Sequence, residues 1–176
     1  MIFHETTLKD CWLLDLEKRG DDRGFFARLM CQNEFEAHGM DTVYVQQNLS
    51  LSRTKGTLRG MHFQKGDAAE AKLVRCLKGA IVDIIIDIRP ESPTYKKWEA
   101  FELTEDNYRQ LYVPRGFAHG FQTITEDTEV SYLVSSFYTP DAEGGIRYND
   151  PAFGIEWPLE PTEMSDKDRN WPDFAG

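Results

Sequence analysis

The sequence predicts an all-β protein, and three observations support this fold class. Short segments rich in β-branched and aromatic residues follow one another along the chain. Glycine and proline turn signals, from Gly20 to Pro140, separate these segments. The 176 residues, 40% of them hydrophobic, include no internal repeat, low-complexity tract or linker-like change of composition. Since domains usually contain about 100–200 residues, we expect one sandwich or barrel domain over residues 1–176.

Ten segments are predicted to be strands because they combine strand-forming residues with flanking turn signals. Their bounds are Cys11–Leu16, Gly24–Met30, Thr42–Leu51, Thr57–Phe63, Lys72–Leu77, Ala80–Ile88, Trp98–Leu103, Gln110–Val113, Gly120–Thr125 and Glu129–Phe137. Only Gln32–His38 is predicted to be helical, with Phe35 as its apolar anchor. The last ~20 residues are expected to form an irregular tail with short turns.

The charge balance and the cysteines restrict the class of protein. Twenty lysines and arginines against thirty aspartates and glutamates give a formal net charge of −10. Nucleic acids and anionic membranes are bound through clustered basic side chains, so neither is expected as a partner. Cys11, Cys31 and Cys76 are widely spaced and odd in number, which is typical of a reducing compartment. Because no signal peptide or transmembrane run is present, we expect a cytoplasmic protein.

One hairpin can be predicted in detail. Lys72–Leu77 and Ala80–Ile88 are separated by only two residues, a length typical of a tight turn. In the register that this turn implies, Lys72 and Asp83 are diagonal neighbours on one face, close enough for an ion pair. A carboxylate within so apolar a strand is costly unless it is paired. The alternative is that Asp83 faces solvent or caps a loop.

Two of the four histidines, His62 and His119, lie at positions suited to chemistry. An imidazole is a candidate base because its unperturbed pKa of about 6.5 lies near neutral pH, and the alternative is a structural histidine in the core. The segment Pro114-x-Gly116-x-x-His119 matches the second half of the pattern of cupins, which are small jelly-roll barrels. In the first half, His62-Phe63-Gln64 replaces two histidines one residue apart. Since one imidazole is missing, we expect a cupin-type jelly-roll barrel without a metal.

Without a metal, proton transfer requires organic acids and bases, and the sequence offers several. His62 is the candidate base, Tyr132 the acid, Lys72 a cation and Asp168 an orienting carboxylate. Tyr132 and Tyr138 have the same parity, so a regular strand would present both phenols on one face. Packing in the core or at its rim is the alternative role for each tyrosine.

The segment around His62 requires an irregular strand. Arg59 and His62 differ in parity, so a regular strand would place them on opposite faces. Gly60 lies between them, and a glycine within a strand often marks a bulge. We therefore predict a bulge at Gly60 that turns both side chains inward.

These motifs, taken in order, point to one family. The chain resembles dTDP-4-dehydrorhamnose 3,5-epimerase and the wider group of nucleotide-sugar 4-keto epimerases nearly end to end. Each motif alone is a weak signal, but the ordered set is a strong one. The set comprises Asp22-Arg23-Gly24-Phe25-Phe26, Gln47-Asn48, Leu58-Arg59-Gly60-Met61-His62-Phe63-Gln64, Ala71-Lys72, Pro114-x-Gly116-Phe117-Ala118-His119-Gly120-Phe121, Tyr132, Tyr138-x-Pro140, Gly145-Ile146-Arg147, Asn149-Asp150-Pro151, Ile155-x-Trp157-Pro158 and Ser165-Asp166-Lys167-Asp168.

The resemblance implies an isomerase without a cofactor that inverts C3, C5 or both in a nucleotide-linked 4-keto-6-deoxy sugar. The expected reaction converts dTDP-4-dehydro-6-deoxy-D-glucose to dTDP-4-dehydro-L-rhamnose. His62, oriented by Asp168, would remove the proton α to the C4 ketone, and Tyr132 would return a proton from the opposite face. Lys72 would stabilise the enolate oxygen. The implied substrate contacts are Arg23 and Arg59 at the diphosphate, Tyr138 on the base, His119 in the sugar pocket, Asp83 beside Lys72, and Gln47, Asn48, Glu143 and Lys167.

The same resemblance implies a homodimer that exchanges an N-terminal strand and serves dTDP-rhamnose and cell-surface polysaccharide biosynthesis. Arg28 stands where the dTDP-sugar enzymes usually have a glutamate. Either Arg28 faces solvent, or it contacts a different ligand, because a cation reverses what this position recognises. A GDP- or CDP-linked 4-keto sugar is therefore the alternative substrate. A metal-dependent cupin enzyme and a non-catalytic sugar-binding cupin are the alternative classes.

Overall fold

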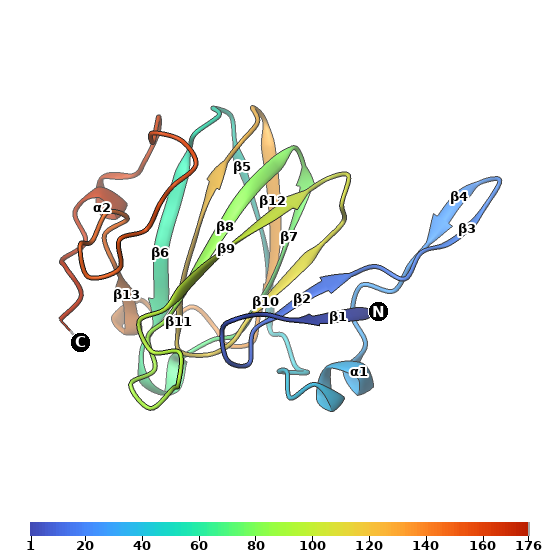
Figure 1. The fold of residues 1–176 in the computed structure, drawn as a ribbon, viewed down its shortest axis with the longest axis horizontal. Helices are drawn as coiled ribbons and strands as arrows, with labels where there is room; N and C mark the ends of the chain where they lie inside the picture. The colour runs from blue at the N-terminus through green and yellow to red at the C-terminus, as the bar shows by residue number, and fades with distance from the viewer. Residues whose placement is uncertain (176) are drawn as a thin grey trace.

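The structure, a computed structural model, describes residues 1–175, and its barrel consists of two antiparallel sheets that face each other (Figure 1). The six-stranded sheet has the order β1 (Ile2–Glu5), β2 (Trp12–Asp15), β10 (Gln110–Val113), β7 (Lys72–Lys78), β12 (Thr128–Val134) and β5 (Gln46–Ser52). The five-stranded sheet has the order β13 (Glu143–Gly145), β6 (Leu58–Gln64), β11 (Phe117–Thr123), β8 (Ala80–Asp87) and β9 (Trp98–Thr104). The all-β prediction is confirmed.

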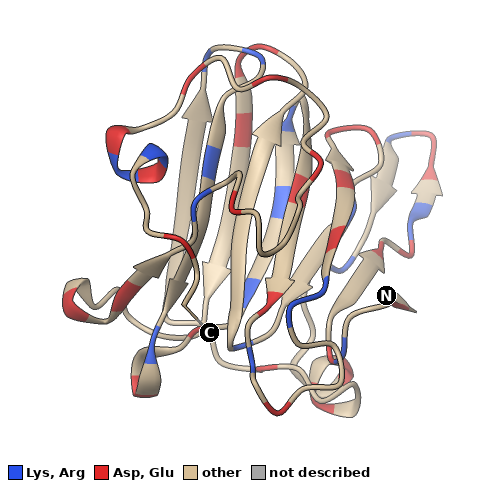
Figure 2. Cartoon of the chain, turned by 60° about the vertical axis from the view of Figure 1, so that its left-hand side comes forward, with Lys and Arg blue, Asp and Glu red and all other residues tan. Residues whose placement is uncertain are grey.

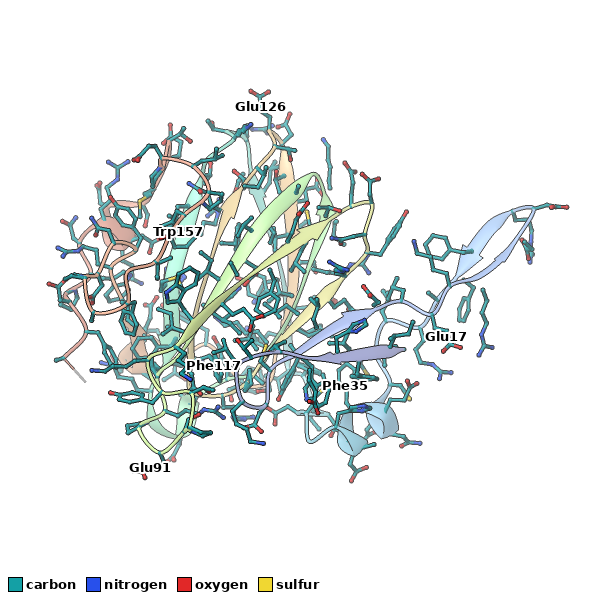
Figure 3. The ribbon with its side chains drawn as sticks, in the orientation of Figure 1. Glu17, Phe35, Glu91, Phe117, Glu126 and Trp157 are labelled. Carbon is teal, nitrogen blue, oxygen red and sulfur yellow. The ribbon has the colours of Figure 1, made fainter. Side chains whose placement is uncertain are left out.

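The space between the two sheets is filled by the inward side chains of alternating strand residues. Val74 and Cys76 of β7 meet Ile81 and Ile85 of β8 in this core. Phe117 lies in the same layer, between the loops labelled at Glu91 and Glu126 (Figure 3). The alternation follows from the strand period of two, which points successive side chains to opposite faces.

The outward face of each sheet is also partly covered. Met61, Ile84 and Ile86 pack beneath the C-terminal segment, which includes Trp157 (Figure 3). This cover explains why Ala80–Asp87 is apolar almost throughout, since the strand is buried on both faces. On the other sheet, the short helix α1 (Gln32–Ala37) buries Phe35. The second helix, α2 (Asp166–Arg169), lies beside β6 (Figure 1).

The hairpin of β3 (Arg19–Asp21) and β4 (Gly24–Phe26) projects from the barrel (Figure 1). Lys18 anchors its base, with Nζ 4.1 Å from the centre of the Tyr108 ring. Beyond the hairpin's base no sheet supports it, and Phe26 is 69% exposed. An exposed apolar side chain on an isolated hairpin indicates an interaction site.

Six of the ten predicted strands match the observed bounds to within one residue at each end, and the other four differ by more. Several predictions were too long or displaced: Gly24–Met30 ends at Phe26, Thr42–Leu51 begins at Gln46, Gly120–Thr125 begins at Phe117, and Glu129–Phe137 ends at Val134. The strands β1, β3 and β13 were not predicted. These short strands have no clear alternation of buried and exposed residues, so their pairing comes from neighbouring strands rather than from their own pattern.

The predicted hairpin register is wrong. β7 pairs with β10 and β12, whereas β8 pairs with β9 and β11 in the opposing sheet. The chain changes sheets at Gly79, which has a φ of +77° and lies so close to Thr125 that an added Cβ would meet its hydroxyl at 2.3 Å. A two-residue connection therefore forms a corner between sheets here, and Lys72 and Asp83 are not diagonal neighbours in one sheet.

Basic and acidic residues are interspersed along the elements visible in Figure 2. In Figure 2, basic segments are short and separated by acidic or uncharged stretches. None of the helices in residues 1–175 is long and apolar enough to cross a membrane.

Candidate active site

A cavity of about 430 Å³ opens between the two sheets, with β5 and β12 on one side and β6 and β11 on the other. It is lined by residues of both sheets and of the segment leading into α2: Ser50, Thr57, Leu58, Arg59, His62, Lys72, His119, Phe121, Tyr132, Glu143, Glu163, Met164, Ser165, Lys167 and Asp168. A second hollow of about 410 Å³ adjoins it and shares His62, Lys72, Tyr132 and Glu143 with it. Together they form one groove.

His62 and Asp168 form a hydrogen-bonded pair on one wall of the cavity. Nε2 of His62 lies 2.6 Å from Oδ1 of Asp168. Ser165 caps α2 by accepting a hydrogen bond from the Asp168 backbone, and the Gly60 backbone N–H donates to Oδ2 of Asp168 at 3.3 Å. Burial alone would raise the pKa of Asp168, but the hydrogen bonds and the neighbouring imidazole hold this pKa below its ordinary value. The aspartate therefore stays ionised and orients His62.

A bulge in β6 brings Arg59 into the same cavity. Opposite β11, His62 pairs with His119, but Arg59 pairs with Phe121, so the register shifts at Gly60. Gly60 has a φ of +138°, and a Cβ there would lie 2.5 Å from the Cα of Gly120. The predicted bulge is confirmed. Arg59 is held at the edge of the cavity, where its Nε donates to the Ser52 hydroxyl at 3.1 Å.

Tyr132 and Lys72 lie on the opposite wall, on β12 and β7. Burial raises the pKa of Tyr132, and the nearby carboxylate of Glu70 raises it further, while Arg59 opposes the shift. Lys72 is 7% exposed, and its Nζ lies 3.4 Å from Oε1 of Glu70. The wall facing His62 therefore has a protonated phenol beside a buried ammonium group.

A second histidine–carboxylate pair lies deeper in the barrel. Nε2 of His119 lies 2.9 Å from Oδ2 of Asp83, which is completely buried. Burial raises the pKa of Asp83, although the positive charges of His119 and Lys72 act against this shift. Oδ1 of Asp83 has no hydrogen-bond partner among the described residues. The alternative placement of Asp83 at the surface is wrong, and the ion pair predicted between Asp83 and Lys72 is replaced by a Lys72–Glu70 pair.

The rim of the groove contains a chain of three polar side chains. The Tyr138 hydroxyl donates to Oε2 of Glu143 at 3.0 Å, and Nζ of Lys167 binds the same oxygen. Tyr138 lies beyond the end of β12 and is 58% exposed, yet it lines the same hollow as Tyr132 and Asn48. An exposed aromatic ring at the edge of a groove is suited to stacking on a planar ligand.

Besides the buried Asp83, three predicted contact residues lie outside the cavity of their own chain. Arg23 is at the tip of the projecting hairpin, where it pairs with Asp21. Arg28 pairs with Glu34 near α1 at 3.2 Å. Gln47 points to the outward face of β5, where its Nε2 donates to the Ser131 hydroxyl at 3.2 Å.

Sequence reasoning missed Glu70 and Ser165 as residues of the site. Glu70 is two residues before Lys72. If the predicted strand were extended to Glu70, the strand period of two would place both side chains on one face. Ser165 is three residues before Asp168, the spacing of a helix N-cap. No group of three or more His, Cys, Asp or Glu side chains within residues 1–175 is arranged to hold a metal ion.

Comparison of the chain with known proteins shows the family to which it belongs. The model of the dTDP-4-dehydrorhamnose 3,5-epimerase family matches residues 5–176. The chain belongs to this family. It is 45% identical over 174 residues to the dTDP-4-dehydrorhamnose 3,5-epimerase of Salmonella typhimurium, covering 98% of this chain and 94% of that protein. The predicted family, its isomerase class and its epimerase activity are thereby confirmed.

Solved structures of epimerases have the same fold. The Bacillus anthracis dTDP-4-dehydrorhamnose 3,5-epimerase, solved with TDP and PPi bound, superposes with a TM-score of 0.94 at 43% identity, covering 98% of this chain and 99% of that one. A 3'-monoepimerase from Streptomyces bikiniensis, in complex with dTDP-quinovose, superposes with a TM-score of 0.88 at 32% identity, covering 97% and 86%. These likenesses confirm the cupin-type jelly-roll barrel.

Proposed function

We propose that this epimerase converts dTDP-4-dehydro-6-deoxy-D-glucose to dTDP-4-dehydro-L-rhamnose without a cofactor. One observation carries the proposal: His62 and Tyr132 face the same cavity from opposite sheets. Inversion of a carbon needs a base on one side of a planar enolate and an acid on the other. The ligands named for the similar solved structures, TDP and dTDP-quinovose, support a dTDP-linked sugar.

His62 removes the proton. Because Asp168 engages Nε2 of His62, the other ring nitrogen, Nδ1, is the atom that accepts the proton from the carbon next to the C4 ketone. The ionised Asp168 then stabilises the imidazolium that forms, as in other histidine–aspartate pairs. The pair also holds the ring in one orientation.

Lys72 and Tyr132 act on the other side of the sugar. When the proton leaves, negative charge develops on the C4 oxygen, and the ammonium group of Lys72 stabilises it. Tyr132 then donates its phenolic proton to the opposite face of the carbon. His119, held by Asp83, lines the sugar end of the cavity and binds a sugar oxygen.

The nucleotide binds along the rim. Arg59 contacts the diphosphate, since a guanidinium is suited to bidentate contacts with phosphate oxygens. Tyr138 stacks on the base. Glu143 accepts the hydrogen bond of the Tyr138 phenol, and Lys167 in turn binds Glu143. Asn48 contributes a polar contact from the adjoining hollow.

The enzyme acts as a homodimer in which the hairpin of one copy completes the site of the other. Arg23 is 90% exposed and distant from the cavity of its own chain, on a hairpin that projects from the barrel. Leu49, Leu51 and Leu77 expose further apolar surface on the outward face of the six-stranded sheet. A second copy seated on this face buries both features, and its Arg23 reaches the diphosphate.

The reaction is tested by proton NMR of dTDP-4-keto-6-deoxyglucose with the protein in D2O, with and without a downstream 4-ketoreductase. Loss of the C3 and C5 signals is expected, and loss of only one marks a mono-epimerase. If neither proton exchanges while a GDP- or CDP-linked 4-keto sugar does, the dTDP assignment is wrong. If these sugars bind but none of their protons exchanges, the protein is a non-catalytic sugar-binding protein.

The shared site is tested by subunit mixing. Arg23→Ala and His62→Asn are each expected to be nearly inactive as pure dimers. In a mixed dimer, one site has a native His62 and receives a native Arg23 from the other subunit, so activity returns. If Arg23 acts within its own chain, no site is fully native and mixing restores nothing. Sedimentation of the unmixed protein as a monomer would contradict the dimer.

A further inference from the structure

Glu70 is a carboxylate inside the groove to which the mechanism above assigns no role. Its side chain is only 12% exposed, and it lines the hollow that contains Tyr132. Oε1 lies 3.4 Å from Nζ of Lys72, and Oε2 accepts a hydrogen bond from Nε2 of Gln64 at 3.0 Å. A buried carboxylate is costly unless it is paired, so its position beside Lys72 needs a reason.

Gln64 holds Glu70 in place. The Gln64 side chain is buried, its Nε2 also donates to the Ala68 carbonyl at 3.1 Å, and its Oε1 accepts from the Thr139 backbone at 2.6 Å. Gln64 stands where the cupin pattern has its second histidine. At this position a buried amide therefore anchors a carboxylate that lines the same hollow as Tyr132 and Lys72.

Tyr132 would lose its proton more readily without Glu70. Arg59 faces the phenol and lowers its pKa, whereas Glu70 raises it, after the larger effect of burial. A proton donor must remain protonated while the substrate is bound. The other charged or titratable groups that line this groove are His62 on β6, Lys72 on β7, His119 on β11, Tyr138 after β12, Glu143 on β13, Glu163 before α2, and Lys167 and Asp168 on α2. Asp83 on β8 does not line the groove but is hydrogen-bonded to His119.

We propose that Glu70 is a positioning residue of this epimerase, which keeps the Tyr132 phenol protonated and holds the Lys72 ammonium group beside it. The carboxylate offsets the effect of the positive charge of Arg59 on the phenol, and its ion pair holds Lys72 in the same groove. This inference rests on the proposed roles of Tyr132 and Lys72. It adds a residue that tunes the proton donor without touching the substrate's reacting carbon.

The test is a spectroscopic titration of Tyr132, measured as the tyrosinate ultraviolet absorbance of each protein minus that of the same protein with Tyr132→Phe. Glu70→Gln keeps the shape of the side chain and removes its charge. The midpoint of the Tyr132 titration is expected to fall by about 1 pH unit. The pH above which sugar inversion declines is expected to fall with it. Glu70→Asp keeps the charge, so its midpoint should lie above that of Glu70→Gln.

The matched control is Glu102→Gln, which removes one negative charge from an exposed position on β9. It should leave the Tyr132 midpoint unchanged. An unchanged midpoint in Glu70→Gln, or an equal fall in Glu102→Gln, would overturn the proposal. The titration needs no substrate, so it reports on Glu70 even if the proposed reaction fails. Conversely, normal exchange of sugar protons with an unchanged midpoint rejects the role of Glu70 alone.

Discussion

The two histidine–aspartate pairs at the groove differ in their surroundings. His62 is 36% exposed at the mouth of the cavity, and its partner Asp168 accepts a further hydrogen bond from the backbone of Gly60. His119 is 7% exposed, and its partner Asp83 has one oxygen without any partner. The pKa of Asp168 lies below its ordinary value, whereas burial raises the pKa of Asp83.

The difference shows why the same two residue types support different tasks. An ionised, well-bonded aspartate stabilises a histidine that becomes positively charged, as a base must. An aspartate whose pKa is raised by burial is a poorer counter-charge for an imidazolium, so we propose the inner pair as a fixed polar contact in the sugar pocket. This contrast supports our proposal that the outer pair supplies the proton-abstracting base.

The largest expected effect is the difference in kcat between variants of the two aspartates. Asp168→Asn should lower kcat for sugar proton exchange by roughly 10²- to 10³-fold, because His62 loses its orientation and its counter-charge. Asp83→Asn should lower it by less than about 10-fold, because an amide still bonds to His119 and His119 moves no proton. Both values come from NMR exchange rates in D2O. Equal losses in the two variants would reverse the assignment of the base.

The next largest effect concerns Tyr132, the group proposed to return the proton. Tyr132→Phe should keep exchange of the abstracted proton within about 10-fold of the native rate but lower inversion by roughly 10²-fold, since only the opposite face lacks its acid. His119→Gln should affect exchange and inversion to the same extent. The ratio of inverted product to exchanged substrate, measured by NMR, distinguishes them. Full inversion by Tyr132→Phe would show that another group is the acid.

The smallest effect concerns stability as a function of pH. The pKa of Asp168 is lowered on folding from 3.8, so its ionised form contributes stability that is present above pH 3.8 and lost as the pH falls through the folded value. Asp168→Asn should therefore cost more unfolding free energy at neutral pH than in acid, by an amount on the order of 1 kcal/mol. Denaturant unfolding at both pH values measures this difference.

Asp83 should behave in the opposite way. Its pKa is raised on folding, so its ionised form destabilises the folded state above the folded pKa, and this cost disappears as the pH falls towards 3.8. Relative to the native protein, Asp83→Asn should thus be most favourable at neutral pH. The same pH trend in both variants would mean that the two aspartates share one environment.

Much of this site was predictable because its motifs are local. The bulge at Gly60 followed from the parity of Arg59 and His62, and the pairing of His62 with Asp168 followed from the family resemblance. The surroundings of Lys72 were not predictable, because the turn at Gly79 joins two sheets instead of two neighbouring strands. A two-residue connection has the same sequence signature in both cases, and the close packing of Gly79 against Thr125 and Thr128 appears only in the folded chain.

The sequence by itself determined the all-β class, the family and the types of residue available for chemistry, because strand period, turn residues and ordered motifs are properties of local sequence. The tertiary structure decided which side chains face one another. It placed Asp83 in the interior with His119, brought Glu70 beside Lys72, and left Arg23 on a hairpin outside its own cavity. These outcomes depend on contacts between residues far apart in the chain, whose burial and charge no local pattern encodes.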